Sequence, residues 1–248
     1  MASPIEQFEV KPIAHFEIAG IDVSFTNSSL WMVIVVAFLT IFLLGGTRKS
    51  ATVPGRWQVM VELMYGFIAG MIRDNVGKEG KQYFPFIFSL FVFVLGLNLA
   101  GMIPYSFTVT SHIAVNFAMA AFIFIGVTLV GFAKNGAGYL KLFAPSGVPL
   151  WLLPMIIIIE VISYCTRPIS LSVRLFANML AGHIMMKVFA GFILSLAAAG
   201  AVGMVGAVVP FAVNVLLTGL EILVACLQAY VFTILTCIYL NDAMHPSH

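Results

Sequence analysis

The fold is decided by residues 150–199, which read LWLLPMIIIIEVISYCTRPISLSVRLFANMLAGHIMMKVFAGFILSLAAA. This stretch is mainly apolar and is interrupted by Pro154 and Pro168. Because a helix rises about 1.5 Å per residue, a helix over the whole stretch exceeds a perpendicular crossing of a bilayer. The sequence therefore predicts a membrane helix that tilts strongly, kinks, or runs partly along the membrane.

Arg174 lies near the middle of this stretch, within Ser170-Leu171-Ser172-Val173-Arg174-Leu175-Phe176-Ala177-Asn178-Met179. A guanidinium stays protonated in proteins. Placing it at the centre of a bilayer costs about 2.5 kcal/mol or more. Such a residue usually faces a partner or a water-filled cavity, so we expect an ion or proton pathway with Arg174 at its centre.

The composition is that of an integral membrane protein. Of the 248 residues, 61% are hydrophobic and 9% are charged, and the mean hydropathy is +1.07. A soluble domain carries about 25% charged residues, so this chain has too few to cover a water-facing surface. The net charge of +2 and the lack of a basic run give no indication of nucleic-acid binding. The cysteines lie in apolar segments without zinc-like spacing to histidine, so we expect no disulfide framework and no metal site.

The apolar segments predict an all-α, polytopic membrane protein of about five crossings. The predicted spans are residues 30–46, 84–103, 113–133, 150–199 and 211–240. The last two are longer than a crossing requires, so they are predicted to be long, tilted helices. Gly200, Gly203 and Gly206 are predicted to form the turn between them.

Residues 57–72 are apolar but short, and basic residues flank them. Together with Glu62, these features favour an interfacial helix or a shallow hairpin over a full span. Because basic residues also follow the first span, the positive-inside rule places that end in the cytoplasm. Residues 1–29 then form an outer N-terminal segment, residues 30–248 a single transmembrane helical domain, and the C-terminus is cytoplasmic. Acidic residues before the first span argue against a signal peptide.

Small and polar residues form one face on each of the last two spans, where they let another helix approach closely. In the stretch around Arg174, the members of this face are Ser163, Arg167, Ser170, Ala177, Asn178 and Ala181. On the last span, Asn214, Glu221 and Gln228 recur on one face. These faces supply the candidate pathway residues.

Consecutive spans joined by a short turn pack antiparallel, so residues at equal depth have a constant sum of residue numbers. One register then brings Arg174 level with Gln228 and His183 level with Glu221. The second pair lies about 10–14 Å closer to the outside, from helix rise alone. An imidazole and a carboxylate can both exchange protons near neutral pH. The sequence therefore predicts a titratable pair on the outer side that leads protons inward to a fixed positive charge.

The candidate proton-pathway residues are Arg174, Glu221, His183, Gln228, Asn178, Asn214 and Glu160. Some of them also have a structural interpretation. Asn214 and Gln228 could form interhelical hydrogen bonds, and Arg174 could be a member of a buried ion pair. His183 could be a hydrogen-bonded structural histidine. Arg167 is expected to be structural, either reaching the interface or pairing with Glu160.

Three runs of this chain resemble the signatures of subunit a of F-type ATP synthases. They are RPISLSVRLFANM at residues 167–179, NLAGMIPY at residues 98–105, and LQAYVF at residues 227–232. The resemblance extends from about residue 12 to about residue 240. The arginine motif is specific, and the runs occur in the family's order.

The resemblance implies a stator that holds two offset aqueous half-channels against a rotating ring of c subunits, each with one essential carboxylate. In that family the residue matching Arg174 keeps the carboxylate deprotonated as it passes and blocks a leak between the half-channels. The implied partners are the c ring, b-type peripheral stalk subunits, the rest of the synthase and the lipid bilayer. The implied location is a bacterial inner membrane, with the mitochondrial inner membrane as the alternative. No phosphate-binding glycine loop occurs, so the chain is not expected to be an enzyme by itself, and no cofactor is expected.

One position pair departs from many bacterial members of the family. There the position matching His183 is glutamate and the position matching Glu221 is histidine. The exchange resembles mitochondrial and alphaproteobacterial members, keeps one imidazole and one carboxylate, and agrees with the predicted neighbourhood of the two positions. Proton rather than sodium coupling follows the family majority.

A self-contained ion channel or secondary transporter is the alternative function. Such a protein should show an internal repeat, broken helices at a central site, or a pore-lining filter. We find no convincing repeat in the sequence. Co-purification distinguishes the two, because a stator should come with a ring of small hairpin subunits.

Overall fold

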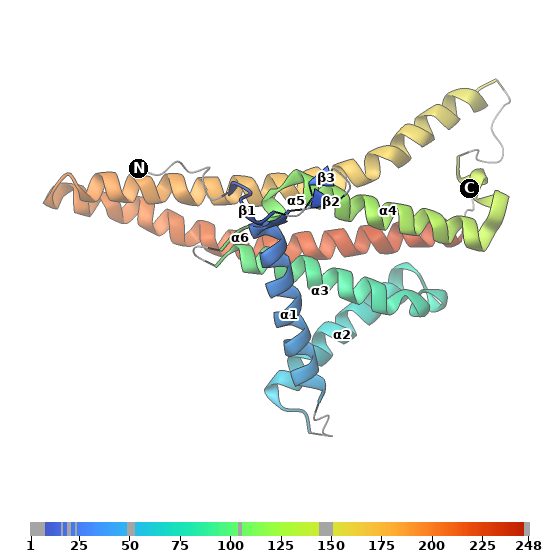
Figure 1. The fold of residues 1–248 in the computed structure, drawn as a ribbon, viewed down its shortest axis with the longest axis horizontal. Helices are drawn as coiled ribbons and strands as arrows, with labels where there is room; N and C mark the ends of the chain where they lie inside the picture. Colours follow the sequence, from blue (N-terminus) through green and yellow to red (C-terminus); the bar gives the residue numbers. More distant parts are fainter. Residues whose placement is uncertain are drawn as a thin grey trace. The chain divides into compact units, whose positions relative to one another are not determined.

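The computed structural model describes residues 8–15, 17–18, 21–22, 24–48, 53–103, 106–143 and 151–245. These residues form six α-helices, together with short 3-10 helices and short strands (Figure 1). The helices are α1 (Asn27–Thr47), α2 (Arg56–Asn75), α3 (Phe84–Gly101), α4 (Ile113–Asn135), α5 (Leu153–Ala197) and α6 (Ala201–Met244). Within this part of the chain, five helical segments are long and apolar enough to cross a membrane. The predicted all-α, polytopic architecture is confirmed.

The last two helices have the predicted excess length, with 45 residues in α5 and 44 in α6. Pro154 lies in the first turn of α5, where the missing N–H of proline has no helical acceptor in any case. Pro168 and Pro210 lie inside α5 and α6. A membrane helix tolerates such prolines because neighbouring groups satisfy the freed carbonyls.

The prediction for the turn before the last helix was wrong. Of the three glycines predicted to form this turn, only Gly200 takes a left-handed conformation, with φ of 90°. Gly203, Gly206 and Pro210 all lie within α6, which begins at Ala201. A Cβ on Gly203 would lie 2.1 Å from the carbonyl oxygen of Leu196. Gly203 therefore allows a close approach of α6 to the end of α5, a packing role that glycine content alone does not distinguish from a turn.

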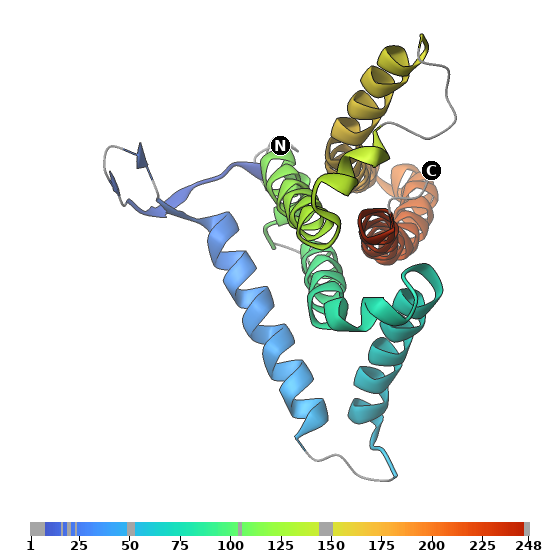
Figure 2. The same ribbon diagram turned by 90° about the vertical axis from the view of Figure 1, so that its right-hand side faces the viewer.

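Helix α2 is one continuous helix of 20 residues, so the hairpin alternative for residues 57–72 was wrong. It is not among the helices apolar enough to span in the described residues, and its interfacial position stays a prediction. The indole nitrogen of Trp57 donates to the carbonyl of Phe42 at 3.1 Å. Gly77, with φ of 81°, turns the chain from α2 into the 3-10 helix η2 (Lys78–Tyr83), which leads into α3 (Figure 2).

The chain divides into two compact units whose boundaries fall inside helices. The first unit comprises Met1–Phe38, Val94–Ile113 and Arg174–Ala229, and the second comprises Leu39–Phe93, Ala114–Val173 and Tyr230–His248. In the first unit, the C-terminal part of α5 and the N-terminal part of α6 lie side by side (Figure 1). Its core includes Leu97, Leu175, Met179 and Ala225, and all four are at most 1% exposed.

Short strands precede α1 in the first unit, a feature that the sequence did not predict. Strand β1 (Pro12–Ala14) pairs with β4 (Phe25–Thr26), and β2 (Glu17–Ile18) pairs with β3 (Ile21–Asp22), both antiparallel. Asn27 joins them to the helix. Its Oδ1 accepts from the backbone N–H of Lys11 at 3.2 Å, and its Nδ2 donates to the carbonyl of Glu9 at 3.0 Å.

The second unit is held by polar contacts at the ends of its helices. The hydroxyl groups of Tyr139 and Tyr164 lie 2.7 Å apart, and Thr128 lies 2.6 Å from Tyr164. Tyr139 belongs to the 3-10 helix η4 (Gly136–Leu142), which follows α4. The Nδ2 of Asn135, at the end of α4, donates to the carbonyl of Ala243 in α6 at 2.6 Å. These bonds join α4, α5 and α6 without using the candidate pathway residues.

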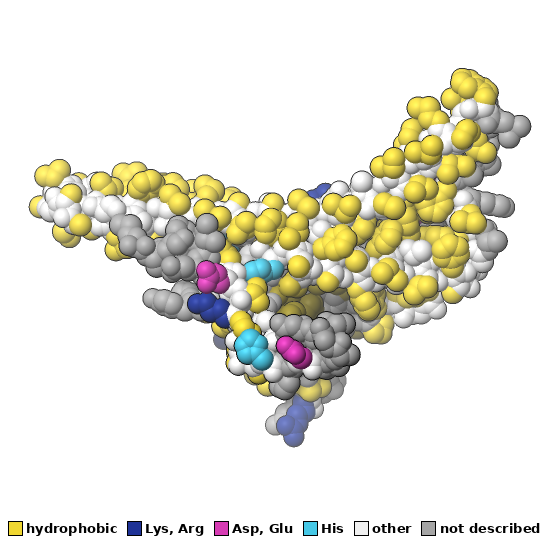
Figure 3. Space-filling view, turned by 45° about the horizontal axis from the view of Figure 1, so that its top comes forward, with side chains coloured by type: hydrophobic (Ala, Val, Ile, Leu, Met, Phe, Trp, Pro, Cys, Tyr) yellow, Lys and Arg dark blue, Asp and Glu magenta, His cyan; other side chains and the backbone are white. Residues whose placement is uncertain are grey.

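The surface of the protein is largely apolar, as expected from its few charged residues. Figure 3 shows hydrophobic side chains over much of one face and few charged ones. In the most apolar window of each helix, 11% is buried in α5 and 11% in α6. The buried share is 44% in the span that contains α3. The faces of α5 and α6 that the described chain leaves uncovered therefore need lipid or a partner to cover them.

Candidate functional site

A cavity of about 850 Å³ lies in the first unit between α3, α5 and α6 and the segments around them. Its polar lining residues are Asn27, Ser106, Thr108, His183, Lys187, Asn214 and Thr218. The side-chain Oδ1 of Asn214 is buried without a hydrogen-bond partner among the described residues. A polar cavity of this size can hold water, because water needs several polar partners and only about 30 Å³ per molecule.

His183 and Glu221 meet at the inner wall of this cavity. The His183 Nε2 lies 3.6 Å from the Glu221 Oε1, and the two residues are 8% and 4% exposed. The predicted antiparallel register is therefore confirmed for this pair. The distance is that of an ion pair and is longer than a hydrogen bond.

Neither carboxyl oxygen of Glu221 receives a hydrogen bond within the described residues. A buried carboxylate without a donor costs several kcal/mol, on the order of the penalty for an unpaired buried charge. Among the described residues, Glu221 therefore presents a buried carboxyl group without a hydrogen-bond donor to the neighbouring imidazole.

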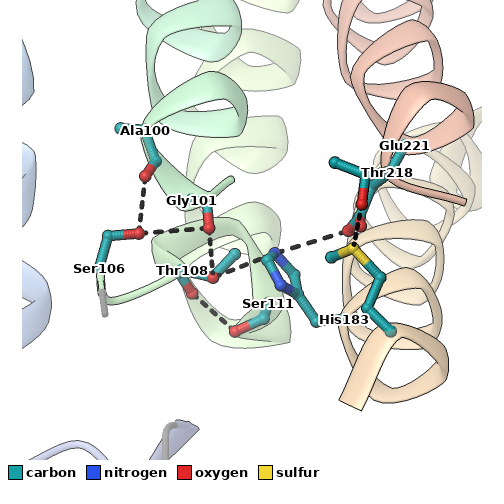
Figure 4. Close-up of polar contacts among 9 residues, drawn as sticks. Ala100, Gly101, Ser106, Thr108, Ser111, His183, Thr218 and Glu221 are labelled. Atoms are coloured by element: carbon teal, nitrogen blue, oxygen red, sulfur yellow. Dashed lines mark hydrogen bonds and ion pairs between the residues drawn. The ribbon is translucent and has the colours of Figure 1, made fainter. Parts of the chain in front are cut away.

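His183 has a second polar neighbour, which comes from the connection between α3 and α4. The Oγ1 of Thr108 lies 3.2 Å from the same Nε2. Figure 4 shows the imidazole placed between Thr108 and Glu221. From the N-terminal segment, the ring of Phe8 packs edge-on against His183 with centroids 6.2 Å apart. The imidazole is thus held from three sides.

A smaller pocket, of about 170 Å³, borders Glu221 in the first unit. Glu221 lines it together with Asn178, Gly182 and other residues of α5 and α6. His183 lines the larger cavity and Glu221 the smaller pocket, so each member of the pair borders one of the two spaces. A Cβ on Gly182 would lie 2.7 Å from the Glu221 Oε1, so only glycine leaves room for the carboxyl group there.

Arg174 and Asn178 are exposed on α5. Within the described residues, no hydrogen bond or ion pair engages Arg174, so pairing with Glu160 or Glu221 is not observed. Gln228 is half-buried. The prediction that Gln228 lies at the same depth as Arg174 is not supported by a contact among the described residues, so it stays a prediction. The uncovered guanidinium needs water or a negatively charged partner outside the chain.

Glu160 and Arg167 belong to the second unit, and the alternative in which Arg167 pairs with Glu160 was wrong. The Arg167 Nη1 lies 3.4 Å from the Asp242 Oδ2 near the end of α6. Its guanidinium also lies over two rings, 5.3 Å from the centroid of Tyr164 and 4.8 Å from that of Tyr239. Glu160 is half-buried. Arg167 therefore fastens α5 to α6 in this unit, which agrees with its predicted structural role.

Sequence reasoning missed Thr108, Phe8 and the buried amide of Asn98. The Nδ2 of Asn98 donates to the carbonyl of Ala225 at 3.2 Å and so ties α3 to α6. The hydroxyl-rich run at residues 106–111 was the available signal for Thr108, although only the structure shows that it folds back onto His183. Among the described residues there is no cluster of three or more histidine, cysteine or acidic side chains that could hold a metal ion.

Comparison with known proteins relates this chain to a family. Residues 29–241 match the family model described as ATP synthase A chain. The ATP synthase subunit a of Parvibaculum lavamentivorans is 58% identical over 245 residues, which cover 99% of this chain and 94% of the relative. The proteins of the same name from Pelagibacter ubique and Rhodospirillum rubrum are 59% and 57% identical, each over 99% of both chains.

Proposed function

This chain belongs to the ATP synthase A chain family, and from this membership we propose that it is the stator and proton-channel subunit of a rotary F-type ATP synthase. It is a membrane component of the enzyme complex and not an enzyme by itself. It is a multi-pass protein of the bacterial inner membrane, in agreement with its apolar helices and its bacterial relatives. The coupled ion is the proton.

The uncovered charge of Arg174 is the single observation that carries this proposal. A permanent cation on an apolar helix, without a partner in the described chain, is costly unless another subunit supplies the partner. A carboxylate on a passing c subunit is such a partner. The arginine then favours release of the proton from each arriving carboxylic acid and separates the two aqueous paths.

Protons reach the ring from the outer side through the cavity that His183, Asn214 and Thr218 line. Glu221 takes up a proton on the cavity side, with His183 as its neighbour. The carboxyl group then gives that proton to a c-ring carboxylate through the pocket beside Asn178 and returns to the carboxylate state. Gln228, at the depth of Arg174, assists this proton transfer.

Protons leave by a separate path on the cytoplasmic side of Arg174. Glu160 lines that path together with Ser163 and Ser170, which are both exposed on α5. The N-terminal segment, residues 1–29, lies outside, residues 30–248 form one transmembrane helical domain, and the C-terminus is cytoplasmic. The c ring covers the bare faces of α5 and α6, and b-type stalk subunits hold the chain still.

Purification from detergent-solubilised membranes tests this function. The tagged full chain should bring down a ring of small hairpin subunits and the soluble ATPase part, and inverted vesicles should acidify with ATP. A chain that runs alone or as a homo-oligomer, and that transports ions without ATPase subunits, would establish the channel or transporter alternative.

A further inference from the structure

We propose that Thr108 is a positioning residue of the proton-uptake path, where its hydroxyl holds the His183 imidazole beside Glu221 in both protonation states. The inference rests on the proposed proton role of His183. Thr108 is 3% exposed and comes from the connection between α3 and α4, far in sequence from both members of the pair.

The geometry makes the hydroxyl adaptable. The Thr108 Oγ1 lies 3.2 Å from the His183 Nε2 and 3.4 Å from the carbonyl oxygen of Gly101. When Nε2 lacks a proton, the hydroxyl donates to it. When Nε2 carries a proton, the hydroxyl accepts that hydrogen bond and donates its own proton to Gly101 (Figure 4). A hydroxyl can do both, whereas a carbonyl or an amide N–H can do only one.

The loop that carries Thr108 is fixed by its own hydrogen bonds. Ser111 donates to the carbonyl of Thr108 at 2.6 Å, and Ser106 donates to the carbonyl of Ala100 at 2.7 Å. A Cβ on Gly101 would lie 2.8 Å from the Thr108 Cγ2, so the loop packs tightly against the end of α3. The position of the hydroxyl is therefore set by the loop and does not depend on His183.

The charged neighbours of the imidazole are few. Glu221 faces it from α6, and Lys187 lies one turn farther along α5, where its ammonium is 5.9 Å from the ring of Phe8. The Glu221 Oε1 lies 3.6 Å from Nε2, which is beyond hydrogen-bond distance, and the Lys187 ammonium can only donate. In this arrangement neither group can both donate a hydrogen bond to Nε2 and accept one from it. Thr108 alone among the described residues meets Nε2 within 3.5 Å.

The test is passive proton conduction through the membrane sector, measured over a pH range that spans histidine titration. Vesicles stripped of the soluble ATPase part are used, and rates are normalised to the assembled subunit. Thr108→Val keeps the shape of the side chain and removes its hydroxyl. We expect conduction to fall about fivefold to tenfold, as for loss of one buried hydrogen bond, with a changed pH profile. Thr108→Ser should restore both rate and profile.

Thr236→Val is the matched control, because Thr236 is also a buried threonine and its hydroxyl donates to the carbonyl of Phe232 in its own helix. It should keep the wild-type pH profile. If Thr108→Val does not assemble, Thr108→Ala removes the same hydroxyl, together with the γ-methyl group. A wild-type pH profile in the hydroxyl-free variant, or the same change in Thr236→Val, would overturn the assignment of Thr108.

Two further variants separate this inference from the proposed function. His183→Ala should impair conduction, and addition of Thr108→Val to it should cause little further loss, because the hydroxyl acts through the imidazole. Unimpaired conduction in His183→Ala would refute the proton role of His183 itself. An impaired His183→Ala beside a normal Thr108→Val would refute only the positioning role.

Discussion

Arg174 is set apart from Arg167, the other arginine of α5, by its surroundings. Arg167 has a carboxylate and two aromatic rings around its guanidinium, so its charge is matched within the chain. Arg174 is exposed and has no such neighbour among the described residues. The two arginines therefore have separate tasks, one in holding helices together and one in meeting a group outside the chain.

Arg174→Ala should abolish ATP-driven acidification of inverted vesicles while the complex still assembles, because the other permanent charge on this face, Arg167, is already paired with Asp242. Arg174→Lys should fail as well, since an ammonium is a compact point charge without the broad guanidinium fork. Acidification at a normal rate by either variant would contradict the central role of Arg174. Arg167→Lys provides a comparison at a position where a cation is already paired.

His183 and Glu221 should behave as a coupled pair, because their charged atoms lie 3.6 Å apart. His183→Ala and Glu221→Ala should each slow proton uptake from the outer side. The double exchange His183→Glu with Glu221→His should recover more activity than either half of the exchange alone, since contacting groups are non-additive. The measurement is ATP-driven acidification in all five variants. A double variant no better than the worse single exchange would show that the two positions do not work together.

At the scale of elements, the α5–α6 hairpin depends on two glycines with different tasks. Gly200 has φ of 90°, which reverses the chain within a short turn. Gly203 already lies in α6, and its missing Cβ leaves space for the last turn of α5. This close approach sets the antiparallel register that brings His183 level with Glu221.

Gly203→Ala should destabilise the hairpin by about 1–3 kcal/mol, the usual cost of overpacking, because its Cβ meets the Leu196 carbonyl. Gly206→Ala is the control, since a Cβ there meets nothing within 4 Å. That change should be neutral or slightly stabilising, because alanine favours helix over glycine. The thermal stability of the purified complex measures the effect of each substitution. Equal losses in the two variants would mean that Gly203 has no packing role.

Arg167 joins α5 to α6 in the second unit through its contacts with Asp242, Tyr164 and Tyr239, which together are called the Arg167 clamp. Arg167→Ala should lower the thermal stability of the complex by about 1–3 kcal/mol, because it leaves the partly buried Asp242 unpaired and removes both ring contacts. Asp242→Asn, which keeps the ring contacts, should cost less. The double variant should cost less than the sum of the two single changes. Strict additivity in the same melting assay would rule out the clamp.

At the scale of the whole molecule, the chain covers its own apolar surface incompletely. The span that contains α3 has 44% of its most apolar window buried, whereas α5 and α6 have 11% each. A membrane provides no hydrophobic driving force for covering them, so packing with another protein must use shape and polar contacts. The small and polar faces of α5 and α6 offer such contacts to the proposed c ring.

Single cysteines should map the two aqueous paths in a background that lacks Cys165, Cys226 and Cys237. Cysteines at positions 214 and 221 should react with a membrane-impermeant thiol reagent from the outer side. Cysteines at positions 163 and 170 should react from the cytoplasmic side, because a continuous aqueous path past Arg174 would dissipate the proton gradient. Labelling of all four positions from one side would indicate a single pore and favour a channel.

The sequence by itself determined the membrane class, the helical architecture and the proximity of His183 to Glu221. These follow from the length of apolar runs, helical periodicity and the register of two consecutive antiparallel helices, all of which are local properties. The tertiary structure decided that α6 begins at Ala201, that Arg167 pairs with Asp242, and that Thr108 reaches His183. These features depend on which distant segments meet. The path of the loop that carries Thr108 and the distance between α5 and α6 are set by side-chain packing. The periodicity of the sequence does not encode that packing.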